Sequence, residues 1–172
     1  MKTAVLIPAY KPEKDLFLPF LDKLSKKFDS IVIINDGSGT DFDAVFEECR
    51  KYTDIVLHHY INKGKGSALK SGIGYIMTRM PDVDGIITAD CDGQHSVEDI
   101  MRVSDELCKY PHDMIIGGRR FDENVPFRSK FGNSLTRWLF KLSTGLKIYD
   151  TQTGLRAFSR EHFEVLSKLP GD

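Results

Sequence analysis

The sequence lacks any long apolar run. Its longest apolar stretches, 16–21 and 138–142, are far shorter than the roughly 20 residues that a helix needs to cross a bilayer. Lys141 also interrupts the second stretch. The chain passes from Met-Lys-Thr straight into a strand-like segment, without the apolar stretch and small-residue cleavage site of a secretory signal. We therefore expect a cytoplasmic chain that does not itself cross a membrane.

Cysteine and net charge are both scarce. The three cysteines, Cys49, Cys91 and Cys108, are an odd set without the close spacing of a zinc site or a redox pair, so we expect reduced thiols that serve packing. The 24 basic and 25 acidic residues leave a formal net charge of −1. Nothing global then steers the protein to nucleic acid or to anionic lipid, and we expect no nucleic-acid partner.

The length fits one domain with a good-sized core, since 172 residues carry 41% hydrophobic content and contain no internal repeat. Apolar segments of strand length recur between segments with helical spacing. The strands are expected at 4–7, 31–34, 55–57, 85–88 and 114–116. The helices are expected at about 16–28, 42–52, 67–80 and 97–110, with Ser96 and Asp99 marking the start of the last and Pro19 blurring the start of the first.

This alternation predicts an α/β fold with a Rossmann-like, open, mostly parallel sheet and helices on both faces. In such sheets the ligand crevice lies beyond the carboxyl ends of the strands. Polar or glycine-rich turns follow four of the predicted strands, at 8–10, 35–38, 90–92 and 117–119. We therefore expect these motifs to gather around one site.

Asp90 and Asp92 flank Cys91 directly after a predicted strand. Two carboxylates so close together repel each other and need a positive partner. The simplest partner is a hard cation such as magnesium or manganese that also bridges a diphosphate. The alternative is that they only form a turn before the helix that Ser96 caps. Taken alone, the pair favours neither interpretation, and its context at a strand end favours the metal.

Two glycine-containing loops are weaker signals. Residues 36–39 read as a turn with positive-φ glycines, although Asp36 could also accept hydrogen bonds from a nucleobase or ribose. Residues 62–66 precede a helix and offer two lysines to phosphates, but their spacing is not that of a P-loop.

The segment between Lys109 and Tyr149 is basic, since it contains eight basic residues and three acidic ones. A solvated helix face accounts best for Arg137 and Lys141. Arg119, Arg128 and Lys130 lie beside the predicted crevice and could receive a phosphate-bearing or membrane-surface acceptor; of these we favour a functional role for Arg119 only.

His95 and Trp138 each have an ordinary alternative. His95 follows the acid pair and could be a metal ligand, a base, or a residue at the surface or behind the metal ligands, and the last interpretation is favoured. Trp138 belongs to an apolar helical stripe that is typical of packing.

The ordered set of motifs resembles the family 2 glycosyltransferases of the GT-A fold, and within them the polyprenyl-phosphate (dolichol-phosphate) sugar synthase-like group. Each motif alone is weak, but their order is specific, and the resemblance covers nearly the whole chain. The motifs lie at 7–10, 34–38, 62–66, 89–95 and 150–156.

The resemblance implies that the nucleoside is held by Pro8, Ala9, Tyr10 and Asp36. Similar proteins usually have Asn-Glu after the Pro-x-Tyr segment, whereas this chain has Lys-Pro followed by Glu13. The usual acidic contact to the nucleotide is therefore lost or moved to Glu13.

The resemblance further implies a metal and diphosphate site, with Mg²⁺ or Mn²⁺ as cofactor. Asp90, Asp92 and Gln94 would surround the metal and the diphosphate, Asp92 being the acid on which catalysis depends. Lys65 is added as a nucleotide contact, and Arg119 would face the phosphates during the reaction.

On the acceptor side, similar proteins place an Asp and an Arg of the last motif near the reaction centre. Asp150 is the candidate beside the acceptor, and Arg156 would bind phosphate or brace the loop, with Arg128 as a further acceptor contact. An acceptor phosphate is already an anion at neutral pH, so positioning and leaving-group stabilisation would dominate over base catalysis.

The sequence thus predicts an inverting transferase that moves a sugar from a nucleotide diphosphate sugar, with a polyprenyl phosphate as acceptor. Similar proteins continue beyond residue 172, so we expect one truncated catalytic domain over 1–172 whose missing part would tether it to the cytoplasmic face of a membrane. The alternatives are a family 2 transferase acting on a saccharide hydroxyl, a nucleotidyltransferase, and a catalytically silent nucleotide-binding module.

Overall fold

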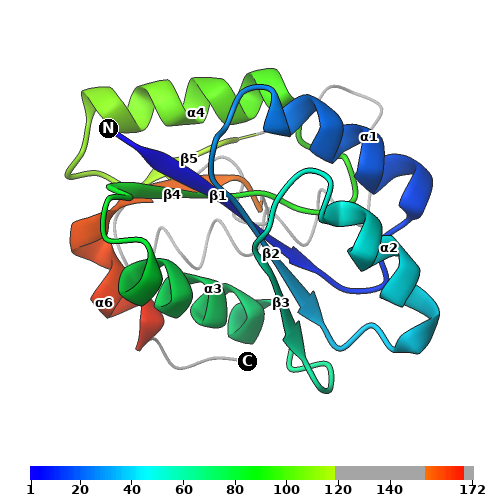
Figure 1. The fold of residues 1–172 in the computed structure, drawn as a ribbon. Coiled ribbons are helices and arrows are strands. Elements are labelled where there is room, and N and C mark those ends of the chain that lie inside the picture. The colour runs from blue at the N-terminus through cyan, green and yellow to red at the C-terminus, as the bar shows by residue number, and fades with distance from the viewer. Residues whose placement is uncertain (119–153, 169–172) are drawn as a thin grey trace, which may run out of the picture.

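A six-stranded sheet with helices on both faces forms the frame of the computed structural model, which describes residues 1–118 and 154–168 (Figure 1). The strands are β1 (Thr3–Ala9), β2 (Ile31–Asp36), β3 (Val56–His59), β4 (Gly85–Thr88), β5 (Ile115–Ile116) and β6 (Arg156–Ser159). The helices are α1 (Lys14–Ser25), α2 (Asp43–Cys49), α3 (Lys65–Arg79), α4 (Val97–Lys109) and α6 (Phe163–Ser167), with 3₁₀ turns η1 (Thr40–Phe42) and η2 (Arg160–His162).

Four neighbouring strands run parallel in the order β3-β2-β1-β4. Val5 of β1 pairs with Ile31 of β2 on one side and with Ile87 of β4 on the other. The predicted α/β class, with an open and mostly parallel sheet, is therefore confirmed. The parallel strands also bring the carboxyl ends of β1, β2 and β4 to the same edge.

The fifth expected strand forms β5, whose neighbour in the sheet is β6 rather than one of the four parallel strands. Strand β6, which the sequence pattern did not reveal, lies between β4 and β5 and is antiparallel to both. Its residues Arg156–Ser159 contain only two neighbouring apolar side chains, too few to give a strand signal. The sheet is therefore mixed, with three parallel pairings and two antiparallel ones. Strand β6 lies against β4.

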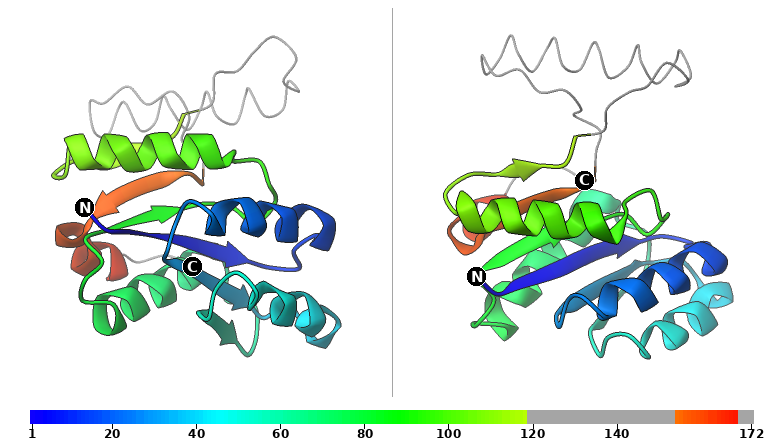
Figure 2. Two further views of the ribbon diagram at one scale, coloured as in Figure 1. Left: turned by 45° about the horizontal axis from the view of Figure 1, so that its top comes forward. Right: turned by 90° about the horizontal axis from the view of Figure 1, so that it is seen from above.

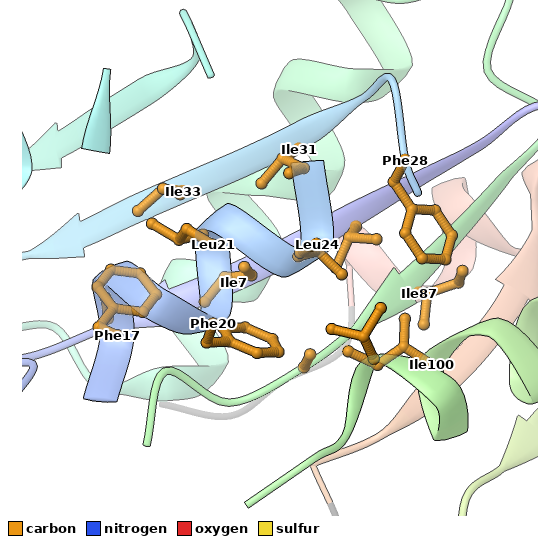
Figure 3. Packing of buried hydrophobic residues seen from close by; sticks show 14 of the residues in the cluster. Ile7, Phe17, Phe20, Leu21, Leu24, Phe28, Ile31, Ile33, Ile87 and Ile100 are labelled. Carbon is orange, nitrogen blue, oxygen red and sulfur yellow. The ribbon is translucent and has the colours of Figure 1, made fainter. Parts of the chain in front are cut away.

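Two apolar clusters fill the spaces between the sheet and its helices. On one face Val5 and Ile7 of β1 pack with residues of α1, α2 and α4, and on the other Ala4 and Leu6 pack with residues of α3 and α6. Figure 3 shows the first cluster, where Phe17, Phe20, Leu21 and Leu24 of α1 point at the sheet. Each such fully buried side chain contributes on the order of 1.5–3 kcal/mol.

The helix ends follow their sequence signals only in part. Ser96 caps α4 as predicted, because its hydroxyl oxygen accepts from the Asp99 amide at 3.1 Å. Pro19 does not mark the start of α1, which begins at Lys14, so the proline lies inside the helix. Figure 2 shows α1 and α4 on the sheet face opposite α3. Within the described parts of the chain no helix combines the length and apolarity needed to cross a bilayer.

Candidate functional site

A cleft of about 380 Å³ lies where β1, β2 and β4 end. It brings together all but two of the residues predicted to bind the nucleotide and the metal; Glu13 and Gln94 do not line it. Asn62, Gly64 and Cys91 contribute as well. The full lining is Pro8, Ala9, Tyr10, Asp36, Asn62, Gly64, Lys65, Asp90, Cys91 and Asp92.

Gly37 lets the loop before α3 reach the end of β2. Its φ of +67° is unfavourable for other residues, and a Cβ there would lie 2.2 Å from the carbonyl carbon of Ile61. The Lys63 amide then donates to Asp36 Oδ1 at 3.0 Å. This close approach holds Asn62 and Lys65 beside Asp36 in the cleft.

The turn after β2 also holds the loop after β1. Asn35 Oδ1 accepts from the Ser38 amide at 3.0 Å, which closes an Asx turn at the end of β2. The Ser38 hydroxyl oxygen in turn accepts from the Lys11 amide at 2.9 Å. Lys11 adopts a left-handed φ of +48°, and its ammonium lies 5.4 Å from the centre of the Tyr10 ring. Tyr10 thus lines the cleft on a loop tied to β2.

Asp36 lines the cleft and is almost fully buried, with 3% of its surface exposed. Besides the Lys63 amide, His59 Nδ1 lies 2.6 Å from its Oδ1. A buried carboxylate needs such donors. The bonds reach Asp36 from β3 and from the loop that follows it, so the carboxylate is fixed before a ligand arrives.

Asp90 carries a strongly acidic carboxyl group. Burial raises its pKa, but the Lys65 ammonium, which bonds to Oδ1, and His95 beside Oδ2 outweigh burial and lower the pKa to about 2. His95 Nε2 lies 3.5 Å from Asp90 Oδ2, within ion-pair range but without hydrogen-bond geometry. Asp90 is therefore an anion at any physiological pH.

Gly154 packs directly against this carboxylate. A Cβ on Gly154 would lie 2.2 Å from Asp90 Oδ2 and 2.4 Å from Oδ1, so only glycine fits. The Thr88 hydroxyl donates to the Gly154 carbonyl at 2.7 Å and ties this segment to β4. Gly154 of the last sequence motif therefore forms part of the wall around Asp90, a contact that sequence reasoning missed.

Asp92 is exposed in the turn that follows Asp90, and its Oδ1 accepts from the Gln94 amide at 3.0 Å. His95 is buried, with 4% of its surface exposed, so the interpretation as a surface residue was wrong. Its position beside Asp90 agrees with the other part of that interpretation, a residue behind the predicted metal ligands. In the chain His95 immediately precedes Ser96, the N-cap of α4.

The acid pair suits a hard cation held jointly with a ligand. Within the described ranges, no cluster of three or more His, Cys, Asp and Glu side chains could hold a metal by itself. Mg²⁺ commonly binds through one or two carboxylates and completes its shell with phosphate oxygens and water. The Lys65 ammonium beside Asp90 shows that the site already accepts a cation. Asp90 and Asp92 therefore fit a metal that arrives with a diphosphate.

The remaining predicted residues lie elsewhere or outside the described parts. Glu13 is exposed and provides the N-cap backbone of α1, and Arg156 is exposed in β6 opposite Thr88. Neither lines the cleft. Arg119, Arg128 and Asp150 lie outside the described residues, as does Trp138.

The family model for glycosyl transferase family 2 matches residues 4–167. The chain belongs to that family. The transferase is 34% identical, over 98% of its own length and 68% of the relative's, to an uncharacterised protein of Methanocaldococcus jannaschii. It is 28% identical, over 95% of its length and 72% of the relative's, to the UDP-N-acetylglucosamine–dolichyl-phosphate N-acetylglucosaminyltransferase of Methanococcus voltae. The predicted resemblance is thus confirmed at the level of the family and of its polyprenyl-phosphate members.

Among solved structures the transferase is similar to glucosyl-3-phosphoglycerate synthase of Mycobacterium tuberculosis in complex with Mn²⁺, UDP and glucosyl-3-phosphoglycerate. The TM-score is 0.69 at 18% identity, over 93% of the transferase and 57% of that chain. The same synthase has also been solved with Mg²⁺ and UDP. At this identity the likeness confirms the predicted GT-A fold, and the transferase spans little more than half of the synthase.

The roles of two residues, His59 and Gly154, could not be predicted from the sequence. His59 lies in an ordinary pair of histidines at the end of β3, and only the pairing of β3 with β2 places it opposite Asp36. Gly154 belonged to a predicted motif, but its contact with Asp90 depends on β6, which was not predicted. Register between distant strands decides both contacts.

Proposed function

We propose that this family 2 glycosyltransferase moves a sugar, with inversion, from a nucleotide diphosphate sugar to a polyprenyl phosphate of the dolichyl or undecaprenyl kind. The observation that carries the proposal is that Asp36, Lys65, Asp90 and Asp92 line one cleft. A nucleoside contact, a cation for phosphate and a pair of metal-binding acids are what a nucleotide diphosphate requires. The name of the Methanococcus voltae relative supports the lipid-phosphate acceptor.

Different residues bind different parts of the nucleotide diphosphate sugar. Asp36 takes the base, and Tyr10 with Pro8 and Ala9 flanks the nucleoside. Asp90 and Asp92 would hold Mg²⁺ or Mn²⁺, which would supply positive charge to stabilise the departing diphosphate. Lys65 would pair with the diphosphate, because its long, charged side chain ends beside Asp90 in the same cleft.

The reaction is a direct displacement at the anomeric carbon. The attacking phosphate oxygen is already ionised, so the protein has to align it and stabilise the leaving group. Arg119, Arg128 and Arg156 are proposed to bind the acceptor phosphate, with Asp150 beside the acceptor. Such an acceptor lies in a bilayer, which supports a peripheral place at the cytoplasmic membrane face.

Replacement of Asp92 by Ala tests the proposal. We expect Mn²⁺-dependent binding of a nucleotide diphosphate sugar and release of nucleoside diphosphate to fall at least a hundredfold, since a lost charge-stabilising contact costs about 2.7–4 kcal/mol in such sites. Asp113→Ala is the control, because Asp113 is exposed and does not line the cleft. Unchanged activity in Asp92→Ala would contradict the site.

The products separate the remaining alternatives. Incubation with polyprenyl phosphate and, in parallel, with a saccharide acceptor shows which one receives the sugar. Release of pyrophosphate from a nucleoside triphosphate and a sugar phosphate would indicate a nucleotidyltransferase. Binding without any turnover would indicate a silent module.

A further inference from the structure

Three side chains form a continuous hydrogen-bonded chain from the cleft to the surface of α3. His59 Nδ1 lies 2.6 Å from Asp36 Oδ1, and His59 Nε2 lies 2.9 Å from the Ser71 hydroxyl. The side chains of His59 and Asp36 are only 9% and 4% exposed. Because a carboxylate only accepts, His59 Nδ1 must carry the hydrogen, which fixes both the tautomer and the orientation of the ring.

The ligand end of this chain is the carboxylate. A serine nucleophile would need its substrate at the hydroxyl, but Ser71 does not line the cleft whereas Asp36 does. The arrangement is therefore suited to holding Asp36 rather than to activating Ser71.

One oxygen of Asp36 is fully engaged. Oδ1 accepts from both His59 Nδ1 and the Lys63 amide, and a carboxylate oxygen has about two lone-pair sites. No hydrogen bond from residues 1–118 or 154–168 reaches Oδ2. A ligand in the cleft therefore meets a single acceptor oxygen on Asp36.

This distinction bears on the nucleobase. Uracil offers one N–H donor between two carbonyl oxygens, which one acceptor oxygen satisfies. Guanine offers two neighbouring donors, N1–H and the 2-amino group, which pair best with both oxygens of a free carboxylate. A base whose second donor stays unpaired in a buried site loses affinity.

We infer that His59 is a positioning residue that presents Asp36 with one open oxygen, so that the cleft selects a uracil nucleotide over a guanine nucleotide. The inference rests on the proposed function, which places the base at Asp36. It assigns a role to two residues, His59 and Ser71, that lie outside the cleft lining.

Calorimetric titration of the full chain with UDP and with GDP, each with Mn²⁺, tests this selection. We expect wild type to bind UDP at least about tenfold more tightly than GDP. In His59→Leu, Asp36 loses a donor and its fixed orientation, so the UDP affinity falls about tenfold and the UDP/GDP ratio narrows. Ser71→Ala removes only the hydrogen bond between Ser71 and His59. It should therefore change the UDP affinity and the UDP/GDP ratio less than His59→Leu does.

His59→Asn and His59→Gln form the matched pair. The Asn amide can take the place of Nδ1 and still donate to Asp36, whereas the Gln amide extends toward Ser71 and cannot. We expect Asn to keep most of the UDP preference and Gln to lose it, and this comparison stands even where His59→Leu fails to fold. A role in folding alone would change stability in both without changing the ratio.

The outcomes separate this inference from the proposed function. A wild type that prefers GDP, or His59 variants that keep the wild-type UDP/GDP ratio, would overturn the inference while Asp92-dependent binding still supports a glycosyltransferase. A wild type that binds neither nucleotide would overturn both.

Discussion

Asp90 shows how one side chain of the site is coupled to the stability of the fold. Its folded pKa of about 2 is below the ordinary value of 3.8. A group with a depressed folded pKa stabilises the protein above its unfolded pKa, and that contribution disappears as the pH falls through the folded value. The relevant window for Asp90 is therefore between about pH 4 and pH 2.

Replacement of Asp90 by Asn should remove this pH dependence. The free energy of unfolding of wild type minus that of the variant should fall by up to about 2 kcal/mol between neutral pH and pH 2. Urea unfolding at a series of pH values measures this difference. In Asp113→Asn, whose exposed side chain lies away from the cleft, the difference should stay flat. Parallel curves for wild type and Asp90→Asn would refute the coupling.

Gly154 makes a second residue-level prediction. In Gly154→Ala the new methyl group meets the Asp90 carboxylate at 2.2 Å, so either the segment or the carboxylate must move. We expect a loss of about 1–3 kcal/mol in stability and weaker Mn²⁺-dependent UDP binding. Urea unfolding and calorimetry measure the two effects.

Gly74→Ala is the control for that substitution. Apart from the nearby backbone of its own helix, no atom of residues 1–118 or 154–168 lies within 4 Å of a Cβ at Gly74. The residue is inside α3, where alanine is favoured over glycine by about 1 kcal/mol. This variant should bind UDP like wild type and be slightly more stable. Equal behaviour of the two alanine variants would mean that Gly154 does not constrain Asp90.

At the residue scale the sequence predicts the cleft well and its supports poorly. Asp36, Asp90 and Asp92 were found because each stands at the end of an apolar strand, where parallel topology brings polar turns together. His59 could not be found in that way, because its role depends on which residue of β2 lies opposite it. Pairing register between strands far apart in sequence is set by tertiary packing.

At the level of elements, Arg160 joins the end of β6 to the end of α3. Its guanidinium donates to the carbonyls of Met77, Met80 and Val83 at 2.8–3.1 Å, which lie in the last turn of α3 and in the loop that follows it. It also lies over the ring of Phe163, 5.7 Å from its centre. One side chain therefore holds three segments together.

Arg160→Ala should therefore cost about 2 kcal/mol or more in the free energy of unfolding, since several part-buried carbonyls lose a charged donor. Arg160→Lys should recover little of this stability. The planar guanidinium spreads its N–H donors over three carbonyls, whereas the compact ammonium of lysine cannot reach all three. Chemical unfolding measures both. Arg79→Ala, an exposed arginine at the end of the same helix, should stay within about 0.5 kcal/mol of wild type.

Strands and helices could be predicted from the sequence where their apolar pattern extends over enough residues. Strands β1, β2 and β4 and helices α3 and α4 lie within a few residues of their expected ranges, because apolar runs and helical spacing recur over enough residues. Strand β6 has four residues and begins with an exposed arginine, so its apolar signal is too short. It forms because β4 and β5 offer it backbone partners on both sides.

For the molecule as a whole, the sheet depends on a segment that comes late in the chain. Ala157 pairs with Ile87 of β4 and with Ile115 of β5, and Phe158 packs against Phe163 in the cluster under α3. The parallel strands alone would leave the edge of β4 open.

A chain ending at residue 118 should therefore fold incompletely. It loses β6, the Arg160 contacts to α3 and part of one apolar cluster, so we expect aggregation and binding of a hydrophobic dye. Size-exclusion chromatography and dye fluorescence measure this. A chain ending at Lys168 keeps every described element and should behave like the full chain. A monomeric, cooperatively unfolding chain of 118 residues would contradict the dependence on β6.

The late arrival of β6 also has a consequence during synthesis. Gly85 of β4 leaves the ribosome long before its partner Ser159, and at about 5–20 residues per second the intervening segment takes several seconds to make. Throughout that interval the nascent polypeptide has an unpaired β4 edge, which other chains can pair with. Demand for holding chaperones should be concentrated in this window and end when residues 156–159 emerge.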